Sequence, residues 1–435
     1  MNYAKQKLLD GPSELRDDNK TGSLACLSIR FALEFNMDNI SRDVAFAQVE
    51  RHMRLCIAAP AGLEKLITIP GSEPLLAEAA YELVEATRTN AVRHLAKHSA
   101  LNCIDRGRRG ELVASLLIMQ AYDAARSLNG GKRWVSVADF MKALLPESKY
   151  NTLVQSRPTF WRTENDSEMT FEAMFEDYGM WFNHIIRIET REMVSIDHLW
   201  RFVTRGAMIL CATNQEGIDI VLPVCHKARN LGPDSVTAII IQVKNVKNFG
   251  TKYVPSLYDG MDSAITSAIF TGSESATGTP EPNEVTPKPV IRLIFALASP
   301  EPAVVFRPGT GVEHCFDAFT TFDILLAGLS GETFKQIGAD FEPYQALLER
   351  SLLPHDAFKM NDDPKIGEKA RILRGARRRK MASLVFAGTD YHEIYQDKRC
   401  LGGKPGEGRP EKAKRKRGTR TPQTERRTRA RTGPT

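Results

Sequence analysis

Polar residues interrupt two apolar, β-rich runs of the chain, and their types could do chemistry together. Asp219 lies within the run 217–225, and Gln242 and Lys244 lie within the run 235–246. Side chains alternate across a strand, so Gln242 and Lys244 share one face. Polar groups buried in this way need partners, because an unpaired buried charge is costly. If the two runs are neighbouring strands, a carboxylate, an amide oxygen and an ammonium group come together.

The elements that must position these groups can be read from the surrounding pattern. A helix is expected over 107–128, where apolar residues recur with a period of 3.6, and Asn129-Gly130-Gly131 ends it. Glu111 lies at its start, just off the apolar stripe, and offers a second carboxylate. Strands are expected at 206–213, 217–225, 235–246 and 289–299, with a helix from about Leu257 between the last two.

This arrangement resembles a known family. Along the expected helix, three strands, helix and strand, the polar residues follow in the order Glu111, Asp219, Gln242, Val243, Lys244. That order resembles the PD-(D/E)xK nuclease superfamily, which has the restriction-endonuclease-like fold, and the Q-x-K form is similar to its Mrr-type branch. The resemblance covers about 190 residues, 106–299. By analogy it extends to fungal families of mobile-element or effector origin that carry such domains.

The resemblance implies an α/β (α+β) fold with an αβββαβ core around a mixed central sheet. It also implies a nuclease that uses Mg²⁺ or Mn²⁺, because a hard cation can activate water and stabilise charge at phosphorus. The implied metal ligands are the carboxylates of Asp219 and Glu111, the amide oxygen of Gln242 and the carbonyl of Val243. Lys244 would orient the attacking water or neutralise the developing charge.

Two positions depart from the family pattern. Ile218 stands where a proline often precedes the aspartate, and Gln242 replaces the usual acid. With one carboxylate fewer, we expect one-metal chemistry or modest activity. The same residues also fit other interpretations: Asp219 and Lys244 as a cross-strand ion pair, and Glu111 as a helix-start acid favoured by the macrodipole.

Charge divides the chain into an acidic body and a basic tail. The formal net charge of +6 combines 59 Lys and Arg with 53 Asp and Glu among 435 residues. The last 65 residues hold 20 basic and 6 acidic side chains, which leaves 39 basic and 47 acidic ones in residues 1–370. We therefore expect a helical N-terminal region (1–100), a nuclease-like core (101–300) with a helical insertion (133–205) and a flexible loop (271–288), a C-terminal extension (301–370) and a basic region (371–435) that is disordered from about 401.

The tail contains two dense basic clusters, Arg377-Arg378-Arg379-Lys380 and Lys414-Arg415-Lys416-Arg417. Such clusters are typical of nuclear import signals and of nucleic-acid contacts, so DNA and an import receptor are the expected partners and the nucleus the expected location. Two other interpretations stay open. The chain could be a catalytically weak or inactive nuclease-like protein that binds DNA, or an unrelated α/β protein whose D…QxK match is accidental.

Other classes have little support. The chain has no apolar stretch of the roughly 18 residues that a membrane span needs, and no secretory pattern at its start, so we expect an intracellular protein. Seven scattered cysteines without a C-x-x-C pair indicate neither a disulfide framework nor a structural zinc site. No phosphate-binding glycine loop is present. The four tryptophans, with Phe171, Phe175 and Phe182, are interpreted as core of the insertion rather than as a base-stacking platform.

Overall fold

The computed structural model describes residues 1–16, 19–33, 42–58, 66–87, 90–98, 106–161, 164–188, 193–212, 217–246, 249–261, 288–309 and 319–349. The basic clusters 377–380 and 414–417 lie outside the described residues. So do residues 271–287 of the expected loop, whereas Lys288 begins a strand. No helix in the described part of the chain is long and apolar enough to cross a membrane.

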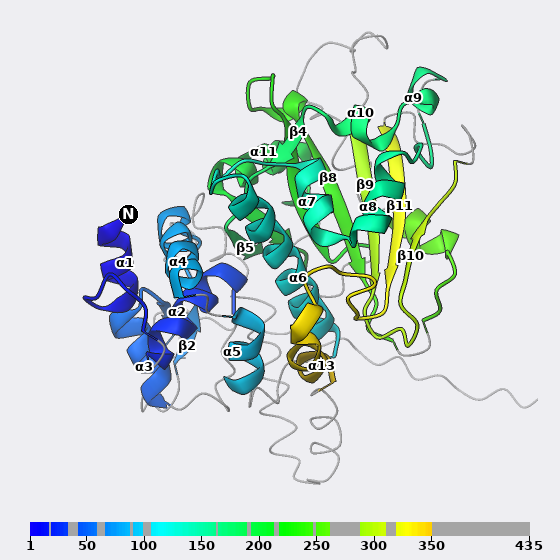
Figure 1. The fold of residues 1–435 in the computed structure, drawn as a ribbon. Coiled ribbons are helices and arrows are strands. Elements are labelled where there is room, and N and C mark those ends of the chain that lie inside the picture. Colours follow the sequence, from blue (N-terminus) through cyan, green and yellow to red (C-terminus); the bar gives the residue numbers. More distant parts are fainter. Residues whose placement is uncertain are drawn as a thin grey trace, which may run out of the picture.

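A nine-stranded mixed sheet forms the centre of the molecule (Figure 1). Its main path runs β10-β11-β9-β8-β7-β4-β3, β6 also pairs with β7, and β5 pairs with β6. The strands are β3 (Val135–Ser136), β4 (Tyr178–Met180), β5 (His184–Arg187), β6 (Ala207–Leu210), β7 (Ile220–His226), β8 (Val236–Val243), β9 (Lys288–Ala296), β10 (Ala303–Phe306) and β11 (Phe319–Ala327).

The expected succession of core elements is present. Helix α6 (Arg106–Leu128) precedes β6, β7 and β8, which are antiparallel neighbours. A helix over 255–261 follows, and β9 then pairs parallel to β8. Strands β8 and β9 are buried on both faces, which is why they read as nearly continuous apolar runs. The α+β class with a mixed central sheet is confirmed.

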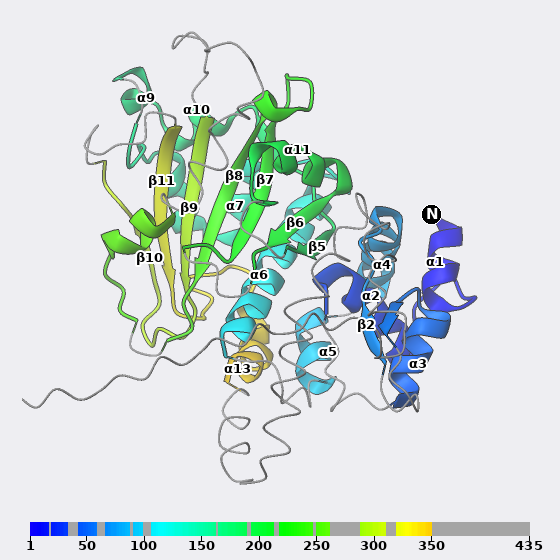
Figure 2. The same ribbon diagram turned by 180° about the vertical axis from the view of Figure 1, so that it is seen from behind.

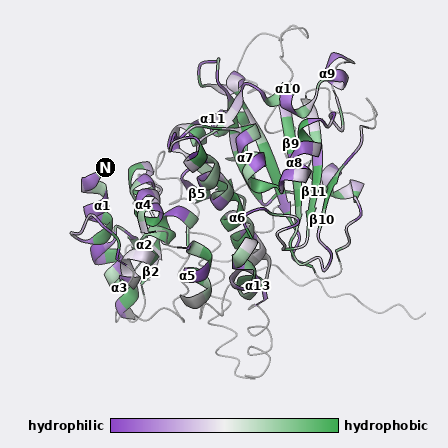
Figure 3. Ribbon diagram, viewed as in Figure 1, coloured by the Kyte–Doolittle hydropathy of each residue, from purple (hydrophilic) through white to green (hydrophobic). Residues whose placement is uncertain are grey.

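Helices cover both faces of the sheet, as the two opposite views show (Figures 1 and 2). One face packs against α6, α7 (Val137–Leu144), α8 (Glu147–Val154) and α10 (Phe171–Phe175). The other face packs against α11 (Ile196–Arg205) and the helix over 255–261. In Figure 3 the central strands are largely hydrophobic, whereas the helices alternate in character. This alternation is expected of helices that bury only one side.

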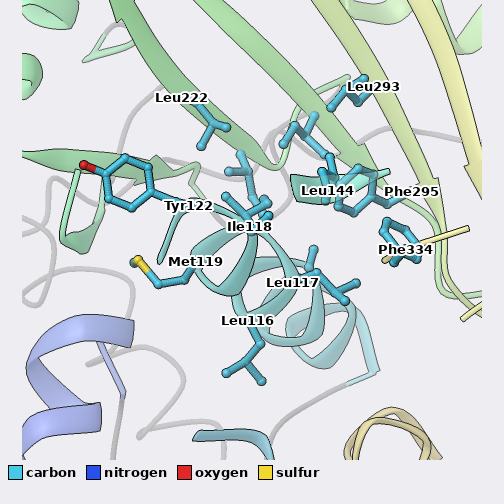
Figure 4. Close-up of a cluster of buried hydrophobic side chains, with 14 of the residues drawn as sticks. Leu116, Leu117, Ile118, Met119, Tyr122, Leu144, Leu222, Leu293, Phe295 and Phe334 are labelled. Carbon is cyan, nitrogen blue, oxygen red and sulfur yellow. The ribbon is translucent and has the colours of Figure 1, made fainter. Parts of the chain in front are cut away.

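Helix α6 anchors the larger core. Figure 4 shows Ile118 of α6 toward Leu222 of β7 and Leu117 toward Phe334, which follows β11, whereas Leu116 and Met119 point away from the sheet. The other labelled residues of this cluster are Tyr122, Leu144, Leu293 and Phe295. The end of α6 matches the sequence expectation: Gly131 adopts a positive φ of 77° and its N–H donates to the carbonyl of Arg126 at 2.9 Å. The helix is therefore fixed at one end by its cap and along its length by packing.

The flanking regions are helical as expected, and they also contain strands. The N-terminal region has five helices among its described residues and a short hairpin: α1 (Asn2–Leu9), α2 (Lys20–Phe31), α3 (Arg42–Arg51), β1 (Leu55–Ala58), β2 (Ile67–Ile69), α4 (Pro74–Thr87) and α5 (Ala91–His98). The insertion contains α7, α8, α9 (Glu164–Glu168), α10 and α11, but it also supplies β3, β4 and β5 to the central sheet. After residue 300 the expected strand is present as β10, and β11 comes in addition, followed by η3 (Gly338–Asp340) and α13 (Phe341–Glu349). A second 3-10 turn, η2 (Pro233–Ser235), lies between β7 and β8.

Candidate functional site

The pairing of β7 with β8 brings Asp219 beside Gln242. Ile220 is opposite Ile241 in the antiparallel register, so the preceding residue, Asp219, lies next to Gln242. The N–H of Asp219 donates to the carbonyl of Ile241 at 2.9 Å, and Oδ2 of Asp219 accepts the N–H of Val243 at 2.6 Å. The carboxylate therefore extends the ladder by one bond at the point where β7 begins.

The main chain of the Q-V-K segment is fixed between two strands. Lys244 donates its N–H to the carbonyl of Phe295 at 2.8 Å and accepts the N–H of Leu297 at 3.1 Å, so its peptide groups point to β9. The N–H and carbonyl groups of the preceding residue, Val243, point to β7 on the other side of β8, since successive residues of a strand bond to alternate neighbours. The carbonyl of Val243 is therefore directed to the Asp219 side.

Asp219 is in surroundings that disfavour a bare negative charge. Burial raises the pKa of its carboxyl above the usual value, although the N–H of Val243 and the ammonium of Lys244 act in the opposite direction. The charge of Lys244 favours the ionised form of Asp219, which agrees with the cross-strand pairing considered from the sequence, although no close ion pair between the two side chains is present in the described part of the chain. A cation at this carboxylate would relieve the cost of burying its charge.

Gln242 has an acceptor that the protein does not use. Its side chain is 7 % exposed, and among the described residues its Oε1 has no hydrogen-bond partner. A buried carbonyl oxygen without a donor is costly in free energy, about 1–3 kcal/mol. Such oxygens are also ligands that a hard cation accepts. The unused oxygen beside Asp219 is thus the feature of this site that best fits a magnesium or manganese ion.

Glu111 reaches the same region because α6 starts against the end of β8. A Cβ on Gly110 would lie 3.0 Å from Cγ1 of Val243 and 3.2 Å from Cβ of Asn245, so the close approach depends on glycine. In this position Oε2 of Glu111 lies 3.4 Å from Nη2 of Arg187 at the end of β5. The second carboxylate of the expected site is therefore held by an arginine.

The buried thiol of Cys211 is influenced by the charges of both carboxylates. Burial raises the pKa of Cys211 well above its usual value, and the charges of Asp219 and Glu111 raise it further, whereas Arg187 lowers it. The N–H of Cys211 also donates to the carbonyl of Asp219 at 2.8 Å. Arg187 and Cys211 are members of this site that the sequence did not indicate.

The donor set suits a hard cation only in part. Asp219, Gln242 and Val243 offer three oxygens of different kinds, while Glu111 is paired with Arg187. Among the described residues no group of three or more His, Cys, Asp or Glu side chains is arranged to hold a metal ion. A metal here would therefore depend on the amide and main-chain oxygens as well as on Asp219.

A second polar cluster joins the N-terminal region to the sheet. Nε2 of the fully buried His184 is 3.0 Å from Oγ of Ser72, and its Nδ1 is 2.7 Å from Oδ1 of Asn183. The order serine, histidine, amide resembles a nucleophile with its base. However, burial, with the charge of Arg205, lowers the pKa of His184 to about 3, so the neutral ring resists the second proton that a general base must accept. We assign this cluster a structural role.

Comparison with known proteins identifies a family but no activity. No curated protein and no solved structure matches the chain. One family model matches residues 15–270, which is more than half of the chain and includes α6, β6, β7 and β8 with Glu111, Asp219, Gln242 and Lys244. The chain therefore belongs to the family described as "Domain of unknown function (DUF8736)".

Proposed function

We propose that this protein is a metal-dependent nuclease that hydrolyses phosphodiester bonds of nucleic acid, with DNA as the expected substrate. The observation that carries the proposal is the unused Oε1 of Gln242 beside the buried carboxylate of Asp219, at the adjoining ends of two neighbouring strands. The succession of helix, three antiparallel strands, helix and parallel strand supports it, because it is the order expected from the PD-(D/E)xK resemblance.

Each residue has a separate task in this proposal. Asp219, Gln242 and the carbonyl of Val243 would hold Mg²⁺ or Mn²⁺, and Glu111 would join them through water while it stays paired with Arg187. The ion, when bound, would activate water and neutralise charge on the phosphate. Lys244 would place its ammonium group against the phosphoryl oxygens, where negative charge develops during hydrolysis.

Cleavage assays with matched variants test the proposal. Purified protein is incubated with plasmid, linear and single-stranded DNA and with RNA, in Mg²⁺, Mn²⁺ or EDTA. We expect Asp219→Asn and Lys244→Met to lose about 100-fold or more in rate, the range typical of removing one charge-stabilising group. Asp43→Asn and Lys335→Met remove the same groups from exposed positions and should cut at the wild-type rate. Wild-type rates in Asp219→Asn would refute the site.

Metal binding can be measured without turnover. Electron paramagnetic resonance of Mn²⁺ reports the free ion, so a titration gives its affinity for the wild-type protein and for Asp219→Asn. We expect the aspartate variant and Gln242→Leu to bind Mn²⁺ at least tenfold more weakly than Asp43→Asn does. Equal affinity in all four proteins would place the ion elsewhere.

A second candidate function is a nuclease-like protein with weak or no catalysis that binds DNA. The ion pair between Glu111 and Arg187 favours it, since it occupies a carboxylate that the metal would otherwise use. In this case the expected result is salt-sensitive DNA binding without cleavage, which is typical of contacts to phosphate.

The basic tail supplies the remaining part of the proposal. The clusters Arg377-Arg378-Arg379-Lys380 and Lys414-Arg415-Lys416-Arg417 would bind phosphates and an import receptor, and would direct an intracellular protein to the nucleus. Deleting residues 401–435 should weaken DNA binding and reduce its salt dependence, while the metal affinity stays unchanged. A fluorescent fusion with and without this segment tests nuclear import, and equal nuclear fractions would refute that role.

A further inference from the structure

A pocket lies at the other end of β7 from Asp219. It has a volume of about 520 Å³, within the range of small-molecule sites, and is lined by residues of α11, β7 and the turn that follows β7. Cys225 of the lining is six residues beyond Asp219 on the same face of the sheet, or about 20 Å along the strand. The pocket is thus separate from the candidate metal site.

Two tryptophans form its aromatic wall. Trp134 and Trp181 both line the pocket, and their Nε1 atoms are buried without a hydrogen-bond partner among the described residues. Both rings lie on glycines: a Cβ would come within 2.6 Å of Trp134 at Gly179 and within 2.8 Å of Trp181 at Gly206. The sequence had placed these tryptophans in the core together with Phe171, Phe175 and Phe182. The three phenylalanines are buried, and the two indoles are partly buried against the core while they also line the pocket.

The rim of the pocket is cationic. Lys227 and Arg229 line it beside His226, and no carboxylate is found among the described residues of its lining. An anionic group would therefore be attracted to this edge of the pocket.

We propose that this pocket binds a nucleotide, with the base against the two indoles and the phosphate at Lys227 and Arg229. Aromatic side chains stack on any base, so the indoles can hold a base without reading its identity. The same chemistry fits a free nucleoside phosphate and a residue of single-stranded nucleic acid. The proposal does not rest on the metal site, since no metal is needed for stacking or for phosphate contacts.

Indole signals of the tryptophans give a direct test. The chain contains four tryptophans, so a ¹⁵N-tryptophan sample yields four indole N–H resonances that single Trp→Phe variants assign. In EDTA, thymidine monophosphate or the hexamer dT₆ should shift the signals of Trp134 and Trp181 saturably and leave those of Trp161 and Trp200 in place. Tighter binding of dT₆ identifies single-stranded nucleic acid as the ligand, and equal binding identifies the free nucleotide. Absence of saturable shifts with both ligands would overturn the proposal.

Two variants with matched controls test the pocket by calorimetry. Thr204→Trp adds a large side chain at an exposed position that lines the pocket, and Lys227→Glu reverses the charge of its rim. Each should weaken binding at least tenfold. Thr152→Trp and Lys335→Glu make the same changes at exposed positions elsewhere, and they should bind like the wild type. Dissociation constants within twofold of wild type in both pocket variants would refute the site.

The outcomes separate this proposal from the nuclease. Asp219→Asn should bind nucleotide with unchanged affinity, because its side chain lies about 20 Å away along β7. If pocket variants bind normally while Asp219→Asn loses cleavage, the pocket fails and the nuclease stands. If Asp219→Asn cuts normally while the pocket variants lose binding, the nuclease proposal fails and the pocket proposal stands.

Discussion

Replacing Asp323 by asparagine should destabilise the fold by about 3–5 kcal/mol. Asp323 on β11 is fully buried and forms a two-pronged ion pair with Arg292 on β9, which is 2 % exposed. Nε of Arg292 lies 2.6 Å from Oδ1, and Nη2 lies 2.7 Å from Oδ2. Two charge-assisted bonds at about 1.5–3 kcal/mol each give about 3–6 kcal/mol, which overlaps the range of about 3–5 kcal/mol known for leaving one buried charge unpaired.

Equilibrium unfolding in urea measures the effect, provided that the slope with denaturant stays unchanged. Glu168→Gln is the control: it removes the acid of an ion pair with Arg157 whose side chains are 61 % and 72 % exposed, and it should cost at most about 1 kcal/mol. Replacing both buried partners, as Arg292→Met with Asp323→Leu, should recover part of the loss, because the buried charges of this pair are gone and only Arg307, which lies 3.5 Å from Asp323 and is 16 % exposed, loses a partner. A loss below about 1 kcal/mol in Asp323→Asn would refute the reasoning.

Three further predictions concern other sites. Gly110→Ala should lower nuclease activity and Mn²⁺ affinity, because the added methyl group pushes α6 away from Val243. The unfolding free energy should change by less than about 1 kcal/mol, because alanine favours the helix. Unchanged activity would contradict the packing argument. The pKa of Asp219 is raised in the folded protein, so its protonated side chain contributes its full stability below the ordinary carboxyl pKa, and this contribution is lost as the pH rises. Asp219→Asn should therefore raise the unfolding free energy at pH 7 without metal. This gain in unfolding free energy should disappear near pH 3. The pKa of His184 is lowered to about 3, so the stability from its neutral ring is full above about pH 6.5 and is lost as the pH falls toward 3. His184→Gln should flatten the decline of the unfolding free energy between pH 7 and 5, measured by urea titrations. An unchanged slope of the unfolding free energy against pH would show that the ring titrates normally.

Much of the core was predictable because its elements carry strong local patterns. Helix α6 has a sustained 3.6-residue period and a glycine end, and β7 and β8 are β-branched runs bounded by turns. Once β7 and β8 are neighbours, alternation alone puts Asp219 near Gln242. Their placement in the structure agrees with that inference, while the role of these residues stays a proposal.

Elements defined by distant partners were not predictable in the same way. Strand β3 has two residues and β4 has three, so neither shows a period, and they become strands only by pairing with each other and with β7. Strand β11, FTTFDILLA, is interrupted by Thr320, Thr321 and Asp323, so its pattern shows neither a clean alternation nor a continuous apolar run. Arg187 was missed for the same reason, because it approaches Glu111 only through the parallel pairing of β5 with β6.

The order of strands in the sheet has a practical consequence for work on this family. The matched region ends at residue 270, yet β8 pairs on its far side with β9, which begins at Lys288. A fragment cut at the family boundary would present the eight residues VTAIIIQV of β8 as an open sheet edge. Exposed apolar edges of this kind recruit strands from other molecules, so such a fragment should precipitate rather than fold. The shortest useful fragment must extend through β11, whose parallel pairing closes β9 in turn.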